Sequence, residues 1–99
     1  MDVPSGVNRA LDLAIELKAH GLVVLDLRGI CTATDFFVLA SGSSDVQVRA
    51  IAEHVVEELK IEGIRPGHVE GIRGGGWILL DYIDFVVHVL LPEARTFYQ

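Results

Sequence analysis

The sequence has little of what several large classes of protein require. Cys31 is the only cysteine among the 99 residues, which excludes an internal disulfide framework and favours a reducing compartment. No apolar run approaches the roughly 20 residues that a membrane-spanning helix needs. The first ten residues, MDVPSGVNRA, include an early acidic residue and no apolar core, unlike a secretory signal. We therefore expect a cytoplasmic protein with no membrane partner.

Lysine is also scarce, because only Lys18 and Lys60 accompany six arginines. The formal net charge at pH 7 is -6. Affinity for nucleic-acid backbones comes from clustered Lys and Arg side chains, so direct binding to nucleic acid should be weak. If this domain works near nucleic acid, we expect it to dock on a basic protein.

What the sequence does contain is a core for one domain over residues 1–99, since 51% of its residues are hydrophobic. Apolar residues recur at three- and four-residue spacing over 7–17 and over 48–59, which predicts two helices. Gly21 is predicted to end the first helix and Gly63 the second. Apolar runs at 22–27, 35–41, 77–82 and 84–91, with a weaker one at 68–73, predict five strands.

The order of these elements predicts an α/β fold with a mixed sheet of about five strands. A helix precedes two strands, a second helix precedes three strands, and a short helix at 92–99 follows. The link at 28–34 is too short for a helical crossover, so the first two strands should pair antiparallel. Ile83 should form a hairpin turn or a bend within one strand. Because most strands are apolar on both sides, we expect helices to cover the sheet.

The stretch LASGSSDVQV (39–48) places a Gly-Ser turn between a strand and a helix, as many phosphate-binding sites do. Ser44 and Gln47 have the spacing of a capping box, in which the Gln47 side chain would reach the N–H of Ser44. Asp45 would repel a phosphate at this position, and the lysine of a P-loop is missing. The stretch therefore favours a helix cap over a nucleotide site.

Metal and catalytic constellations are weak in this sequence. Asp81 and Asp84 could hold a divalent ion only if Ile83 forms a turn, because residues three apart on a strand point to opposite faces. None of the four histidines has the spacing of a zinc site with another histidine or with Cys31. We predict no catalytic residue, no cofactor and no metal.

The last two predicted strands contain residues with two open interpretations. Trp77, Leu79 and Asp81 share one face of a regular strand, and Tyr82 belongs to the other. Both faces are mostly apolar, which is typical of a core. A Trp that follows three glycines, near two Asp and a Tyr, also has the composition of an interface anchor. Core and interface are both open for Trp77 and Tyr82, and His88 is expected to be a hydrogen-bonded core or edge residue.

Two blocks of the chain resemble the ribosomal silencing factor family, also called the Iojap-type family. They are DFFVLASGSSDVQVRAIAEHV (35–55) and EGIRGGGWILLDYIDFVVHVLLPEARTFY (70–98). The family pattern leads from an Asp-aromatic-Phe-Val strand into Ser-Gly-x-Ser, and later has Gly-Trp, Leu-Leu-Asp-Tyr and Val-Val-His-Val. VVLDLRG (23–29) also matches. Ile83 departs from the pattern, since the family more often has Gly there.

The resemblance implies a function. Family members bind the large ribosomal subunit through ribosomal protein L-fourteen, block joining of the small subunit and repress translation under nutrient limitation. The resemblance also implies a nucleotidyltransferase-like core without catalytic acids, and a homodimer when the protein is free. The implied partner contacts, by motif position, are Glu70, Trp77, Leu79, Asp81, Tyr82 and Asp84. The residues implied to hold the turn and orient the sheet are Asp35, Ser41, Gly42, Ser44 and Gln47.

Three classes of function are therefore compared. The first is a non-enzymatic factor that occupies the large subunit and excludes the small one. The second is a nucleotidyltransferase-like nucleotide binder, and the third is a dimeric large-subunit assembly factor. The acidic charge and the weak catalytic constellations favour the first class.

Overall fold

The structure, a computed structural model, describes residues 3–96. Its helices are α1 (Ser5–Glu16), α2 (Asp45–Ile61) and α3 (Pro92–Thr96). Its strands are β1 (His20–Asp26), β2 (Phe36–Ser41), β3 (His68–Glu70), β4 (Trp77–Asp81) and β5 (Phe85–Leu90). This is the predicted order of elements, and the end of the last predicted helix lies outside the described residues. None of the helices within 3–96 is long and apolar enough to cross a membrane.

The five strands form one mixed sheet in the order β1-β2-β5-β4-β3. The central pair, β2 and β5, is parallel, and all other neighbours are antiparallel. The predicted antiparallel pairing of the first two strands is therefore confirmed. The structure also settles the prediction for Ile83, because β4 and β5 form a hairpin around it.

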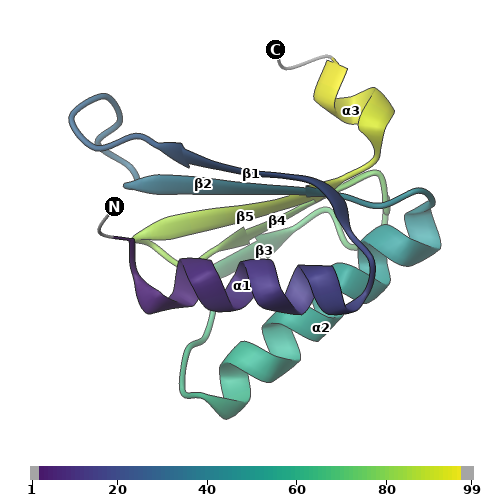
Figure 1. The fold of residues 1–99 in the computed structure, drawn as a ribbon, viewed down its shortest axis with the longest axis horizontal. Helices are drawn as coiled ribbons and strands as arrows, with labels where there is room; N and C mark the ends of the chain where they lie inside the picture. The colour runs from purple at the N-terminus through teal and green to yellow at the C-terminus, as the bar shows by residue number, and fades with distance from the viewer. Residues whose placement is uncertain (1–2, 97–99) are drawn as a thin grey trace.

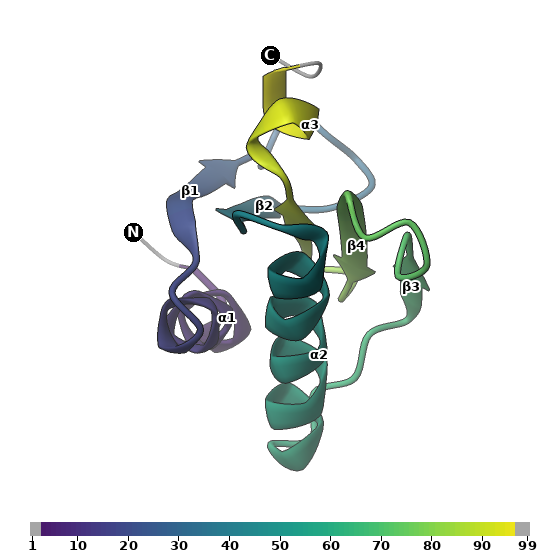
Figure 2. The same cartoon turned by 90° about the vertical axis from the view of Figure 1, so that its right-hand side faces the viewer.

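Both long helices cover the same face of this sheet, as Figures 1 and 2 show. Alternate strand residues point toward the helices and form the core, among them Phe36, Val38, Ile78 and Leu80. Of the elements that the structure describes, the other face carries only the short helix α3, at one end (Figure 1). The expectation of a covered sheet thus holds for one face only, although the strands are apolar on both.

The two long helices end in the same backbone motif. After α1, the N–H of Lys18 donates to the carbonyl of Ile15 and that of Ala19 donates to Ala14, which is a Schellman arrangement. Gly63 occupies the matching position after α2, with a φ of 84°, so that prediction is confirmed. The prediction for Gly21 is wrong. Lys18 adopts the left-handed conformation that ends α1, and Gly21 belongs to β1, where the pairing register shifts.

Ile83 adopts an unusual backbone conformation at the tip of the β4–β5 hairpin. Its φ is 75° and its side chain is 70% exposed. The N–H of Ile83 donates to the Asp81 carboxylate at 2.8 Å, and the N–H of Tyr82 donates to the Phe85 carbonyl at 2.9 Å. A β-branched residue is strained in this conformation, whereas glycine is not.

Replacing Ile83 with glycine is expected to raise the free energy of unfolding by about 1 kcal/mol. A positive φ costs a residue with a Cβ about 1–2 kcal/mol, and the greater freedom of glycine in the unfolded chain returns part of that gain. Urea denaturation measures this change in the free energy of unfolding, and the dependence of that free energy on urea concentration should stay the same. Ile83→Ala is the matched control, because it keeps the Cβ and should gain less than half as much. An equal gain from alanine would show that the exposed apolar side chain, not the backbone, is responsible.

Candidate interaction surface

The Gly-Ser turn before α2 is a helix cap that also joins the two long helices. The Ser44 hydroxyl accepts from the N–H of Gln47 at 3.1 Å, as predicted. The Gln47 side-chain oxygen accepts from the N–H of Ser43 at 2.6 Å, not from that of Ser44 as the capping box predicts. Its amide nitrogen donates to the carbonyls of Leu17 and Lys18 at 3.1 and 3.3 Å. One side chain therefore links the start of α2 to the end of α1.

Bonds within the turn occupy four of the N–H groups that a phosphate could use. The N–H groups of Ser43 and Gln47 are bonded as described, that of Val46 donates to the Asp45 carboxylate, and that of Val48 donates to the Ser44 carbonyl. Gly42 is buried, and a Cβ at that residue would lie 3.0 Å from a Val48 methyl group. Anion binding at a helix start depends on unpaired N–H groups. The geometry therefore supports a structural role for this turn.

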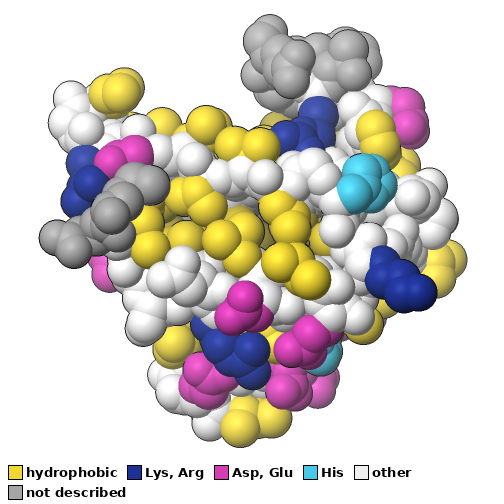
Figure 3. All heavy atoms as spheres, in the orientation of Figure 1, with side chains coloured by type: hydrophobic (Ala, Val, Ile, Leu, Met, Phe, Trp, Pro, Cys, Tyr) yellow, Lys and Arg dark blue, Asp and Glu magenta, His cyan; other side chains and the backbone are white. Residues whose placement is uncertain are grey.

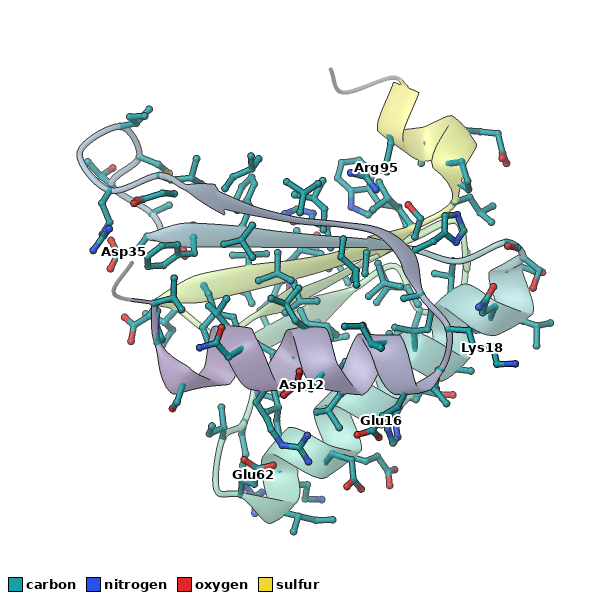
Figure 4. All side chains as sticks on the ribbon, viewed as in Figure 1. Asp12, Glu16, Lys18, Asp35, Glu62 and Arg95 are labelled. Carbon is teal, nitrogen blue, oxygen red and sulfur yellow. The ribbon has the colours of Figure 1, made fainter. Side chains whose placement is uncertain are left out.

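Arg95 connects α3 to the sheet, and Figure 4 shows its side chain on the side of the sheet opposite α1 and α2. Its guanidinium donates to the Gly21 carbonyl and, at 3.0 Å, to the Ser41 hydroxyl. Ser41 is buried at the end of β2, so this bond satisfies its polar group. Gly21 allows the close approach, because a Cβ there would lie 2.4 Å from the Arg95 nitrogen.

The uncovered face of the sheet contains a groove of about 750 Å³, which we call the open groove. Its lining residues are Val23, Leu25, Phe37, Leu39, Trp77, Leu79, His88, Leu90 and Arg95. They come from β1, β2, β4, β5 and α3. Among them, only Arg95 carries a permanent charge, and only His88 can ionise near neutral pH. Side chains in this face are thus mostly apolar, as in the centre of a protein interface.

Figure 3 shows how apolar and charged side chains separate on the surface. Apolar side chains reach the surface along β1 and between β1 and α1, whereas charged side chains gather over the helices. In this helical layer Arg9 pairs with Glu62 at 2.6 Å, and His54 bonds to Glu16 at 2.8 Å. Such exposed pairs are typical of a face in water. The β1 edge of the sheet is therefore the more apolar part of this view.

A hydrogen bond joins two side chains that line the open groove. The Trp77 indole Nε1 donates to Nδ1 of His88 at 3.0 Å. Phe37 packs edge-on against the imidazole, with ring centroids 4.5 Å apart. Burial lowers the pKa of His88, which therefore stays neutral at pH 7. The expectation of a hydrogen-bonded core or edge histidine is confirmed, and its partner is Trp77.

A family model described as "Ribosomal silencing factor during starvation" matches residues 1–99. The chain belongs to the ribosomal silencing factor family. The silencing factor of Bacillus subtilis (strain 168) is 36% identical over 82 residues, which cover 83% of this chain and 70% of that protein. That of Chromobacterium violaceum is 32% identical over 99 residues, which cover 100% of this chain and 81% of the relative.

The similarity extends to an organelle protein and to a solved structure. The chloroplastic protein Iojap of Zea mays is 33% identical over 88 residues, covering 87% of this chain and 37% of its own length. An X-ray structure of a Chromobacterium violaceum protein matches with a TM-score of 0.93 at 32% identity, covering 99% of this chain and 82% of that one. A ribosomal silencing factor is a regulator of translation, so the chain is assigned to that broad class.

The structure of this silencing factor brings only part of the implied contact set together. Trp77 and Leu79 line the open groove, and Asp81 follows them on the same side of β4. Glu70 and Asp84 are exposed outside the groove. Tyr82 lies elsewhere: it is buried in the helix-covered core and stacks on Phe85 at 4.9 Å. Burial raises the pKa of its hydroxyl to about 12, and this hydroxyl has no hydrogen-bond partner among residues 3–96.

The remaining implied residues lie at the ends of β2. Asp35 is exposed before the strand, far from Arg95 in Figure 4, and its N–H donates to the carbonyl of Asp84 at 3.1 Å. Ile83 does form the turn that a metal site at Asp81 and Asp84 would require, yet Asp81 uses its carboxylate to hold that turn. Within residues 3–96, no group of three or more possible ligands is placed to hold a metal ion.

Sequence reasoning missed most of the open groove. Val23, Leu25, Phe37, Leu39 and Leu90 were assigned to strands without being recognised as a surface. The available signal was the near-absence of polar residues on either side of β2 and β5 in a chain with only two long helices. Two helices cover one face of such a sheet, so the second face stays apolar and open.

Proposed function

We propose that the open groove docks this silencing factor on the large ribosomal subunit through ribosomal protein L-fourteen. The bound domain occupies the face that the small subunit would approach, so it blocks subunit joining and represses translation when nutrients are short. It acts in the cytoplasm, where ribosomes work, and by binding rather than catalysis. The observation that carries the proposal is an apolar groove, uncovered by the two long helices, in a member of this family.

The charge of the chain supports a protein as the docking target. Its net charge of -6 disfavours direct binding to ribosomal RNA, whereas a basic ribosomal protein is electrostatically complementary. Asp81, Asp84 and Glu70 lie near the β4 side of the open groove and can attract such a protein over a distance. Exposed charges of this kind speed association and orient partners more than they add affinity. The apolar groove then supplies the contact area.

Leu25→Glu is expected to weaken binding to large subunits about 30-fold, because it places a charge within an apolar contact. Leu25 lines the open groove and is 43% exposed, so the domain can fold with glutamate at this position. Co-sedimentation of the purified protein with large subunits measures the effect. The added negative charge should not repel a basic partner, so a loss of binding reports the apolar contact.

Ile61→Glu is the matched control for this experiment. Ile61 is 77% exposed at the end of α2 and does not line the open groove. The same change of side chain there should leave binding within about twofold, as is usual for surface substitutions away from an interface. Equal losses from both variants would point to net charge, and no loss from either would exclude the open groove as the docking surface.

The proposed block of subunit joining can be tested separately from binding. Purified small and large subunits are mixed with and without saturating protein, and the fraction of joined ribosomes is measured by sucrose-gradient sedimentation. The proposal expects fewer joined ribosomes with the wild-type chain and no change with Leu25→Glu. Unchanged joining despite full occupancy of the large subunit would refute steric exclusion. Co-purification with precursor subunits instead of mature ones would favour the assembly-factor alternative.

A further inference from the structure

The bond between Trp77 and His88 fixes the protonation state of the histidine. An indole N–H can only donate, so the Nδ1 atom that receives it must be unprotonated. A neutral imidazole then carries its proton on Nε2. The ring centroids are 5.8 Å apart, and both side chains line the open groove. Trp77 is thus held by an acceptor that exists only while His88 is neutral.

The position of His88 is costly for a residue that merely fills space. Its side chain is 7% exposed, and Nε2 has no hydrogen-bond partner among residues 3–96. A leucine or phenylalanine would fill this central-strand position without an unsatisfied donor. Unlike leucine or phenylalanine, the imidazole supplies an acceptor for the Trp77 indole.

We propose that His88 is a positioning residue for docking: its Nδ1 holds the Trp77 indole in the orientation that fits the partner, and protonation of Nδ1 releases the indole. The inference rests on the proposed docking of the open groove on the large subunit. It names the acceptor side chain in that groove and adds a pH dependence to partner binding.

The surroundings of His88 favour its neutral form. The side chains that line the open groove from β1, β2 and β4 are apolar or aromatic, and none is a carboxylate. From α3 the lining residue is Arg95, a cation, which cannot form an ion pair with an imidazolium. Burial lowers the pKa of His88, since charge is disfavoured away from water. Among the described lining groups, none would therefore stabilise an imidazolium.

The sign of the pH effect follows from this lowered pKa. Above about pH 6.5, the ordinary value for histidine, His88 is neutral in both the folded and the unfolded chain. As the pH falls, the unfolded chain takes up the proton first, so the folded state loses stability relative to it. At still lower pH the folded protein is protonated, Nδ1 becomes a donor, and its bond to Trp77 breaks. Docking should be strong near pH 8 and weaken as His88 is protonated.

The decisive comparison uses His88→Asn and His88→Leu. Asparagine can offer an amide oxygen close to the position of Nδ1 and does not titrate, whereas leucine has no acceptor. Dissociation constants for large subunits are measured from pH 8 to pH 5.5 and divided by those of His88→Asn. This ratio cancels titration of the partner and of the other three histidines.

We expect His88→Asn to restore most of the binding at pH 8 that His88→Leu loses, because it keeps an acceptor for the Trp77 indole. At the acidic end the wild type should bind about fivefold more weakly than His88→Asn, the effect of losing one hydrogen bond. His88→Leu should bind large subunits about fivefold more weakly than His88→Asn at every pH. A wild-type to His88→Asn ratio that stays constant over this range would overturn the positioning role.

A second measurement needs no ribosome. Trp77 is the only tryptophan, so its fluorescence reports directly on the contact with His88. The emission of the wild type should titrate with a midpoint below pH 6.5, and that of His88→Asn should not. Flat wild-type emission would overturn the inference. Failure of the wild type to bind at pH 8 would instead refute the proposed function, while the fluorescence titration still tests the Trp77–His88 contact.

If His88→Asn does not fold, Trp77→Phe replaces it. Phenylalanine keeps an aromatic ring but removes the donor, so His88 no longer has an indole to hold. Binding by Trp77→Phe should then be independent of His88 protonation. A pH dependence equal to that of the wild type would overturn the inference.

Discussion

Replacing Gly71 with alanine is expected to lower the free energy of unfolding by about 4 kcal/mol. Gly71 follows β3 with a φ of 87°, and a Cβ built there would lie 2.0 Å from the Trp77 carbonyl oxygen. The clash is with the backbone of β4, so no side-chain rotation can relieve it. Since typical domains are stable by only 5–15 kcal/mol, roughly, the variant should be close to unfolding.

Gly63→Ala separates the clash from the backbone conformation. Gly63 has nearly the same φ, 84°, but no atom of residues 3–96 outside its immediate neighbours lies within 4 Å of a Cβ placed there. Its replacement should cost only about 1 kcal/mol, the penalty of a left-handed conformation. Urea denaturation of both variants gives the difference. Equal losses would show that the short strand β3 moves away from β4 at little cost.

Trp77→Ala is expected to weaken binding to the large subunit about 100-fold. Aromatic anchors at the centre of an interface contribute roughly 2–4 kcal/mol when truncated, and 2.7 kcal/mol corresponds to about 100-fold in affinity. Trp77 lines the open groove, and its indole is held by His88 at 3.0 Å. Titration of large subunits with labelled protein measures the dissociation constant.

Circular dichroism and urea denaturation must accompany this measurement, because Trp77 also packs against its neighbours. Trp77→Phe is the graded control, since it keeps most of the apolar area and removes the N–H. It should weaken binding about fivefold, in agreement with the value expected for His88→Leu. A folded Trp77→Ala protein that binds like the wild type would show that the partner contacts another surface.

The sequence predicts the elements of this fold well, for a local reason. The helix over 45–61 has a capping pair at its start and a glycine at its end, so both boundaries depend on neighbours in the chain. The pairing of β1 with β2 follows from a short connecting link. The end of α1 was predicted less well, because Lys18 takes a conformation that favours glycine and Gly21 was three residues further on.

The open groove depends on information that the sequence does not present locally. Apolar residues on both sides of β2 and β5 do not say which side the helices will cover. Trp77 and His88 meet only because β4 and β5 pair in a particular register, which places Leu79 opposite His88. The bonds from Gln47 to Leu17 and Lys18 likewise need the tertiary fold. The family motif placed Tyr82 in the implied contact set. Side chains alternate between the two faces along β4, however, and this alternation directs Tyr82 into the core.

The arrangement of the sheet also has a consequence for how the chain folds. The antiparallel pairs β1–β2 and β4–β5 join segments that are close in the sequence, and each can form early. The two pairs meet along the parallel pair β2–β5, in which Phe36 lies opposite Phe85. These two strands are far apart in the sequence, because α2, β3 and β4 lie between them. Neither hairpin has a complete apolar layer before that meeting. Closure of the β2–β5 seam should therefore limit the folding rate, and the two halves should unfold as one cooperative unit.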